Sequence, residues 1–161
     1  MAFANLRPAL ASFDAAVAAF GMPLMTYEVE ILRAPHQQRR DLPSGHGAVY
    51  VFALAGHVDC PAGPGRVLKV GRVSASSNNR FRYQHYSATA APSTLARSLV
   101  KYQLLWPWLG VEHLDASTVH AWMHANLDRA NVYLSPGDLD QLPSLEMYIR
   151  AHVGSVYEGS A

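Results

Sequence analysis

A mixed α/β fold of the α+β type is predicted by three features of this sequence. Two apolar runs rich in β-branched residues, 48–55 and 66–73, flank a Gly/Pro-rich turn and indicate a hairpin with a long loop. Residues 25–32 alternate in the manner of a half-buried strand. Apolar residues recur at helical spacing in 5–20 and again in 143–153. The length of 161 residues suits one domain with a single core.

The first half of the chain is predicted to hold one helix and three strands. The N-terminal helix ends at Gly21, because the glycine and the proline two residues later stop it. Side chains alternate along a strand, so Tyr50 and Phe52 share one face of 48–55. If the hairpin pairs in register, Tyr50 and Lys69 lie on the same face, but the sequence leaves that register open.

The second half is predicted to be mainly helical. A helix begins after the hairpin, capped by one Ser or Asn of 76–79, and runs to residue 86. Further helices are expected over 93–106, 117–127 and 143–153. A short strand over 130–134 precedes the last of them. Pro143 begins that last helix and Gly154 ends it.

Charge is unevenly distributed along a chain whose net charge is only +1. From residue 60 to residue 111 there is no Asp or Glu, and the seven cations are Arg66, Lys69, Arg72, Arg80, Arg82, Arg97 and Lys101. Such a block is what a phosphate backbone would meet, although a solvated basic face without a partner has the same pattern.

Cysteine and hydropathy patterns exclude several classes of protein. The single cysteine, Cys60, excludes an intrachain disulfide and a zinc cluster built on cysteines. No stretch of the sequence is long and apolar enough for a transmembrane helix. We therefore expect a cytoplasmic protein.

Glu146 borders the buried stripe of its predicted helix, where a carboxylate needs a partner. One interpretation is an ion pair with Arg150, one helical turn later. The other is a ligand for a hard divalent cation such as Mg²⁺, which often takes one or two protein carboxylates and leaves its other positions to water and phosphate.

Other side chains suit phosphate binding or proton transfer. Arg80 and Arg82 lie near the start of a helix, and an arginine fork matches phosphate oxygens in pairs. The candidate proton carriers are Tyr50, Lys69, Tyr83, His85 and Tyr86. His120 and His124 are one helical turn apart, as two ligands of one metal would be, but histidines on a helix face are more often surface residues. The HExxH pattern is absent.

In this order, these residues resemble the GIY-YIG endonuclease family. The first family motif is matched by Ala48-Val49-Tyr50 after Gly47, and the second by Lys69-Val70-Gly71. An arginine on the following helix is matched by Arg80, with a His or Tyr about one turn later. A glutamate on a late helix is matched by Glu146. The resemblance covers about residues 47–159.

The resemblance implies a small three-stranded antiparallel sheet flanked by helices over 41–161, with 1–40 as a helix-strand extension. It implies hydrolysis of DNA phosphodiester bonds with one Mg²⁺ or Mn²⁺ held by Glu146. Tyr50 would position or deprotonate the attacking water, Arg80 would stabilise phosphorane charge, and His85 or Tyr86 would carry a proton. The remaining cations expected to bind DNA are Arg72, Arg82, Arg97 and Lys101. A homodimer would supply the surface that so small a domain needs to read bases.

Two departures from the family pattern leave alternatives open. Lys69 stands where the family has a tyrosine, so either the lysine takes over that role or the chain is a nucleic-acid-binding module with weak or no cleavage. Arg80 with His85 and Arg82 with Tyr86 are rival alignments. An enzyme that uses the same basic pocket for a nucleotide or another phosphate ligand is a third possibility.

Overall fold

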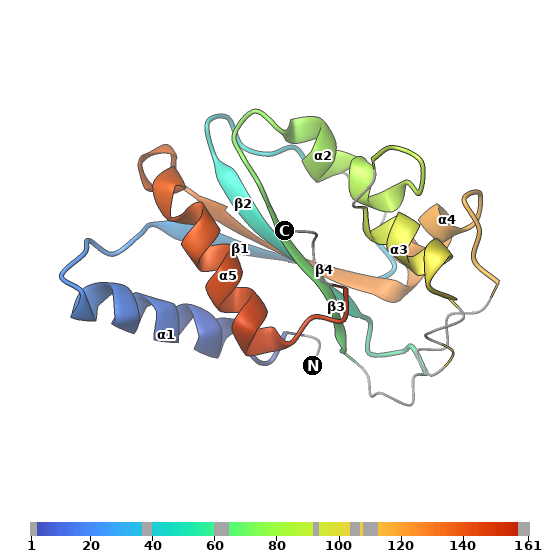
Figure 1. Cartoon of the computed structure of the whole chain (residues 1–161), viewed down its shortest axis with the longest axis horizontal. Coiled ribbons are helices and arrows are strands. Elements are labelled where there is room, and N and C mark those ends of the chain that lie inside the picture. The colour runs from blue at the N-terminus through green and yellow to red at the C-terminus, as the bar shows by residue number, and fades with distance from the viewer. Residues whose placement is uncertain are drawn as a thin grey trace.

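The computed structural model of the chain describes residues 3–36, 40–59, 65–91, 94–103, 107 and 113–157. Cys60 and most of the hairpin turn lie outside these residues, as does Ser93, where a helix was predicted to begin. The fold is α+β, as predicted: α-helices lie on both sides of one antiparallel sheet (Figure 1).

The sheet has four strands within the described residues, in the order β1-β4-β2-β3. They are β1 (Tyr27–Leu32), β2 (Gly47–Leu54), β3 (Val67–Val73) and β4 (Leu127–Leu134). The three strands implied by the resemblance are therefore one too few. The fourth is β1 of the N-terminal extension, which pairs with β4 from Tyr27 opposite Leu134 to Leu32 opposite Arg129. This pairing satisfies backbone groups that would otherwise form an open edge on β4.

Strand β4 is longer than the predicted 130–134. It begins at Leu127, directly after the last residue of the preceding helix. All eight of its residues are buried. Its even-numbered and odd-numbered positions face opposite sides of the sheet, and the polar side chains of Arg129 and Asn131 fall on one side. Those two polar residues interrupt the apolar run and hide the start of the strand in the sequence.

Among the described elements, two α-helices cover one face of the sheet, and three α-helices with one 3₁₀-helix cover the other (Figure 1). On the first face α1 (Leu6–Ala19) and α5 (Leu142–Val153) pack against each other and against apolar residues of β2, β3 and β4. On the second lie α2 (Asn78–Arg82), the 3₁₀-helix η1 (Gln84–Tyr86), α3 (Leu95–Lys101) and α4 (Val119–Asn126). The predicted helix over 76–86 is thus two short helices.

Strand β3 forms the outer edge of the sheet, and later residues cover its beginning. The backbone N–H groups of Val156 and Tyr157 donate to the carbonyl oxygens of Val67 and Leu68 at 3.2 and 2.7 Å. Helix α5 lies between the 3₁₀-helix η4 (Pro136–Gln141) and these two residues. It ends at Gly154, as predicted, and this glycine has the left-handed conformation.

The strand register places two rows of residues side by side on the face toward α2 and η1. One row is Glu30, Asn131, Tyr50 and Gly71, and the next is Leu32, Arg129, Phe52 and Lys69. The predicted shared face of Tyr50 and Lys69 is therefore confirmed. No described helix combines the length and the hydropathy needed to cross a bilayer.

Candidate active site

Tyr50 lies at the centre of the candidate site, and Gly71 makes room for it. The Tyr50 side chain is 1 % exposed. Its hydroxyl lies over Gly71 on the neighbouring strand, so that a Cβ atom there would be 2.2 Å from the hydroxyl oxygen. Only glycine permits the ring to cross β3 in this way. The phenol therefore reaches the outer edge of the sheet while its ring stays buried.

Arg80 from α2 hydrogen-bonds to the Tyr50 hydroxyl. Burial raises the pKa of Tyr50 to about 12, although the positive charges of Arg80 and Arg129 oppose the rise. At neutral pH the hydroxyl therefore keeps its proton. It can orient a water molecule or a phosphate oxygen, and Arg80 fixes its direction.

Lys69 lies on the same face, one row away from Tyr50, with 3 % of its surface exposed. Burial, together with the positive charges of Arg80 and Arg150, lowers the pKa of Lys69 to about 8, while Glu146 acts in the opposite direction. The ammonium form still predominates at pH 7. A modest fraction of neutral amine is nevertheless present near neutral pH, unlike for an ordinary lysine.

Glu146 on α5 accepts from two arginines. Its Oε1 accepts from Arg150 Nη2 at 2.5 Å, which is the ion pair predicted one turn later, and its Oε2 accepts a short hydrogen bond from Arg72 Nη1 on β3. The glutamate is 7 % exposed. Arg72 lies opposite Val49 in the strand register, so Arg72 and Glu146 lie on the α1 and α5 face of the sheet, opposite to the face of Tyr50 and Lys69. The charge of Glu146 nevertheless acts on the pKa of both Tyr50 and Lys69.

His85 and Tyr86 are both buried but point to different partners. The His85 ring centroid is 4.3 Å from that of Tyr50, and neither ring nitrogen has a hydrogen-bond partner among the described residues. Burial, with the charges of Arg129 and Lys69, holds the pKa of His85 well below its usual range, so this imidazole is neutral. Tyr86 instead stacks on His124 with centroids 4.3 Å apart.

The fold separates the two rival alignments. Arg80 and His85 both contact Tyr50. Arg82 forms an ion pair with Asp41 at 2.7 Å, and its guanidinium carbon is 4.7 Å from the centroid of the Tyr83 ring. The structure therefore brings Arg80 and His85, and not Arg82 and Tyr86, to the tyrosine of the first motif.

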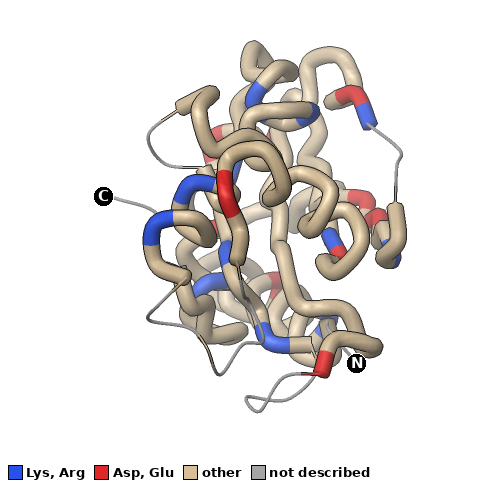
Figure 2. The backbone as a smooth tube through the Cα atoms, turned by 90° about the vertical axis from the view of Figure 1, so that its right-hand side faces the viewer, with Lys and Arg blue, Asp and Glu red and all other residues tan. Residues whose placement is uncertain are grey.

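Residues 60–111 contain no Asp or Glu, but in the folded chain acidic side chains from other segments pair with two of their arginines. Asp41 and Glu146, from outside that stretch, pair with Arg82 and Arg72. Figure 2 shows that Lys and Arg lie on several separate elements rather than on one helix. Arg97 and Lys101 are exposed on α3, and no described contact joins either to the Tyr50 cluster.

The two histidines one helical turn apart, His120 and His124, pack among rings. Their centroids are 4.6 Å apart, and His124 also contacts His36 and Tyr86. Within the described ranges, no group of three or more His, Cys, Asp or Glu residues could hold a metal ion.

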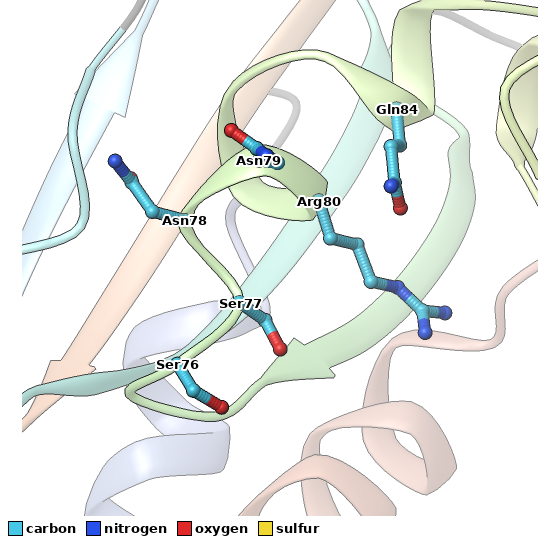
Figure 3. Close-up of a pocket in the computed structure, with 6 residues that line it drawn as sticks. All are labelled: Ser76, Ser77, Asn78, Asn79, Arg80 and Gln84. Carbon is cyan, nitrogen blue, oxygen red and sulfur yellow. The ribbon is translucent and has the colours of Figure 1, made fainter.

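A polar pocket of about 360 Å³ lies beside Arg80. Its lining residues are Ser76, Ser77, Asn78, Asn79, Arg80 and Gln84. Figure 3 shows the Arg80 and Gln84 side chains extending from α2 and η1 toward the same space. Amide and hydroxyl groups thus line the pocket together with this arginine.

Sequence reasoning missed Arg129 of β4. It is 4 % exposed, and its guanidinium carbon lies 4.3 Å from the centroid of the Phe81 ring and 5.9 Å from that of Tyr50. The sequence did carry a signal: Arg129 and Asn131 occupy alternate positions of a buried strand. Polar residues with that spacing point together toward one face.

Comparison with known proteins yields no relative for this chain: no family model, no curated protein and no solved structure matches it.

Proposed function

We propose that the chain is a divalent-metal-dependent endonuclease of the GIY-YIG kind that hydrolyses DNA phosphodiester bonds at the edge of β3. One observation carries the proposal: the Tyr50 hydroxyl lies over Gly71, receives a hydrogen bond from Arg80, and is within the electrostatic influence of Glu146. These residues come from four elements, β2, β3, α2 and α5. They are the residues that the resemblance assigns to the site.

The charge around this edge favours a phosphate ligand. Arg72 and Arg150 pair with Glu146, while Lys69 and Arg80 lie by Tyr50, so four cations share this edge with one carboxylate. A phosphodiester supplies the negative charge that this group lacks, and guanidinium groups match its oxygens in geometry as well as in charge. A neutral substrate would leave the mutual repulsion of the cations unrelieved.

The pKa values of the side chains indicate which of them orients the water and which accepts its proton. Tyr50 keeps its proton and orients the attacking water. Lys69 has the pKa closest to neutrality and is the candidate to accept the proton of that water. His85 stays neutral and offers a ring nitrogen as a hydrogen-bond acceptor, and Arg80 stabilises the charge that develops on the phosphoryl oxygens.

Glu146 fits a divalent cation if the phosphate arrives with it. Each carboxylate oxygen already accepts from one guanidinium but has a second lone pair. Mg²⁺ accepts a single protein carboxylate when waters and phosphate oxygens complete its shell. When bound, such an ion supplies Lewis-acid polarisation of the phosphate and lowers the pKa of a bound water.

A second candidate function is a nucleic-acid-binding module without cleavage. The two arginines that occupy Glu146 favour it, and so does Lys69 in place of tyrosine. In that case the cationic edge binds the backbone and the carboxylate serves only to hold Arg72 and Arg150.

Plasmid nicking distinguishes the two functions. Purified protein is incubated with supercoiled DNA and Mg²⁺ or Mn²⁺, beside Glu146→Ala and a control, Arg7→Ala, which alters an exposed cation on α1. We expect nicking by the wild type and the control, and none by Glu146→Ala with its circular dichroism retained. Undiminished nicking by Glu146→Ala rejects the metal assignment. Salt-dependent DNA binding without cleavage under either metal selects the binding module.

A further inference from the structure

Arg129 is a buried charge with an unusual set of neighbours. Aromatic rings surround its guanidinium: the centroids of Phe81, Phe52, Tyr50 and Tyr86 lie 4.3, 5.3, 5.9 and 6.0 Å from the guanidinium carbon. The guanidinium also hydrogen-bonds to the Tyr86 hydroxyl. A cation in contact with ring faces is stabilised by their quadrupoles.

The compensation of this charge is indirect. Arg129 Nε donates to Asn131 Oδ1 at 2.8 Å, and Asn131 Nδ2 donates to Glu30 Oε2 at 3.1 Å. Glu30 is itself paired with Arg40 at 2.8 Å. A neutral amide therefore separates Arg129 from the carboxylate of β1. Nη2 of the guanidinium has no hydrogen-bond partner among the described residues.

Burying a cation without a direct counter-ion is costly, so a fold that keeps one gains something from the position. The guanidinium of Arg129 lies beneath the candidate site. Tyr50 and His85 lie over the same aromatic cluster, with ring centroids 4.3 Å apart, and Phe52 contacts both rings.

We propose that Arg129 is a positioning residue of the site, a fixed positive charge that holds Tyr50 and His85 from behind and adds to the attraction of the β3 edge for phosphate. The part that concerns phosphate rests on the proposed function. The part that concerns Tyr50 and His85 does not. Asn131 and Glu30 fix the orientation of the guanidinium, which gives the N-terminal strand β1 a role in the site.

The protonation of His85 tests the first part without any activity. The groups that face this ring are Arg129, Lys69 and Arg80, which oppose its protonation, together with the phenol of Tyr50. The full chain is labelled with ¹³C at its histidine rings and titrated by NMR. The wild-type His85 ring should become protonated only well below the usual pH range of a histidine. In Arg129→Gln its protonation should begin about one pH unit higher, because a buried charge is removed.

Two further variants separate charge from packing. Arg129→Lys keeps the cation and should leave the His85 titration as in the wild type. Arg7→Gln removes a cation from the other side of the sheet and should have no effect. An unchanged titration in folded Arg129→Gln overturns the proposal. If that variant does not fold, Glu30→Gln decides: loss of the distant carboxylate should make His85 harder to protonate, and an easier protonation overturns the proposal.

DNA binding in EDTA tests the second part. The affinity for a short duplex should fall about threefold to tenfold in Arg129→Gln and stay near that of the wild type in Arg129→Lys. Equal losses in both variants indicate a packing role and overturn the electrostatic part. If plasmid nicking fails while the His85 titration still shifts, the nuclease function is wrong and the role of Arg129 stands.

Discussion

Replacing Gly71 by alanine should displace Tyr50 and so test the geometry of the site. The added Cβ would lie 2.2 Å from the Tyr50 hydroxyl oxygen, 2.5 Å from Cζ and 2.9 Å from Cε2. Restoring an ordinary contact requires the buried ring to move by about 1 Å or more. Overpacking of this kind costs about 1–3 kcal/mol, and the lower chain entropy of alanine returns a few tenths. We expect a net loss of about 1–2 kcal/mol.

Urea unfolding measures the loss, and Gly137→Ala is the matched control, because no atom lies within 4 Å of a Cβ at that position. In a Tyr50→Leu background the Gly71→Ala change should cost less, since the ring that it strikes is absent. DNA binding should weaken as Tyr50 loses its bond to Arg80. Equal stability of Gly71→Ala and Gly137→Ala would refute the assignment of Tyr50 to this position.

Two further predictions concern charge. Burial lowers the pKa of Lys69 to about 8 in the folded chain. Between about pH 8 and 10 the lysine therefore keeps its proton in the unfolded chain but has lost it in the folded chain. The free energy of unfolding should rise over this range by about 2 kcal/mol relative to Lys69→Met. Urea unfolding at both pH values measures this, and parallel curves would contradict it. Arg80→Ala should lower the salt slope of DNA binding by about 1, whereas Arg82→Ala, whose guanidinium pairs with Asp41, should change it little. Fluorescence titrations at several salt concentrations decide between them, and the reverse order would restore the rival alignment.

Several elements of the fold could be predicted because each leaves a local pattern of apolar residues in the sequence. The hairpin, the alternation in β1 and the helical spacing of α1 and α5 are each visible within a few turns or residues of the chain. The pairing of β1 with β4 could not be predicted, because two segments about 100 residues apart meet there and nothing local marks the partner. The resemblance, which lacks β1, implied one strand too few.

The site divides in the same way. Tyr50, Arg80 and Glu146 stood out by type and order, and the fold brings their side chains or charges together. The pairing of Arg72, a predicted DNA contact, with Glu146 could not be predicted, because it depends on how α5 crosses β3. Arg129 was overlooked, because its importance arises from four rings contributed by three segments. Such convergence is a property of packing, which a linear pattern does not show.

The hydrogen bonds from Val156 and Tyr157 to the first residues of β3 have a consequence for Glu146. They anchor the chain just beyond α5, while the backbone N–H of Thr26 donates to Asp138 at 3.0 Å just before it. The helix that carries the acid is thus tethered to the sheet at both ends, and its axial rotation is restricted. Loosening either tether should let the carboxylate swing away from the strand edge, so the alignment of this acid depends on residues more than one helical turn away from it.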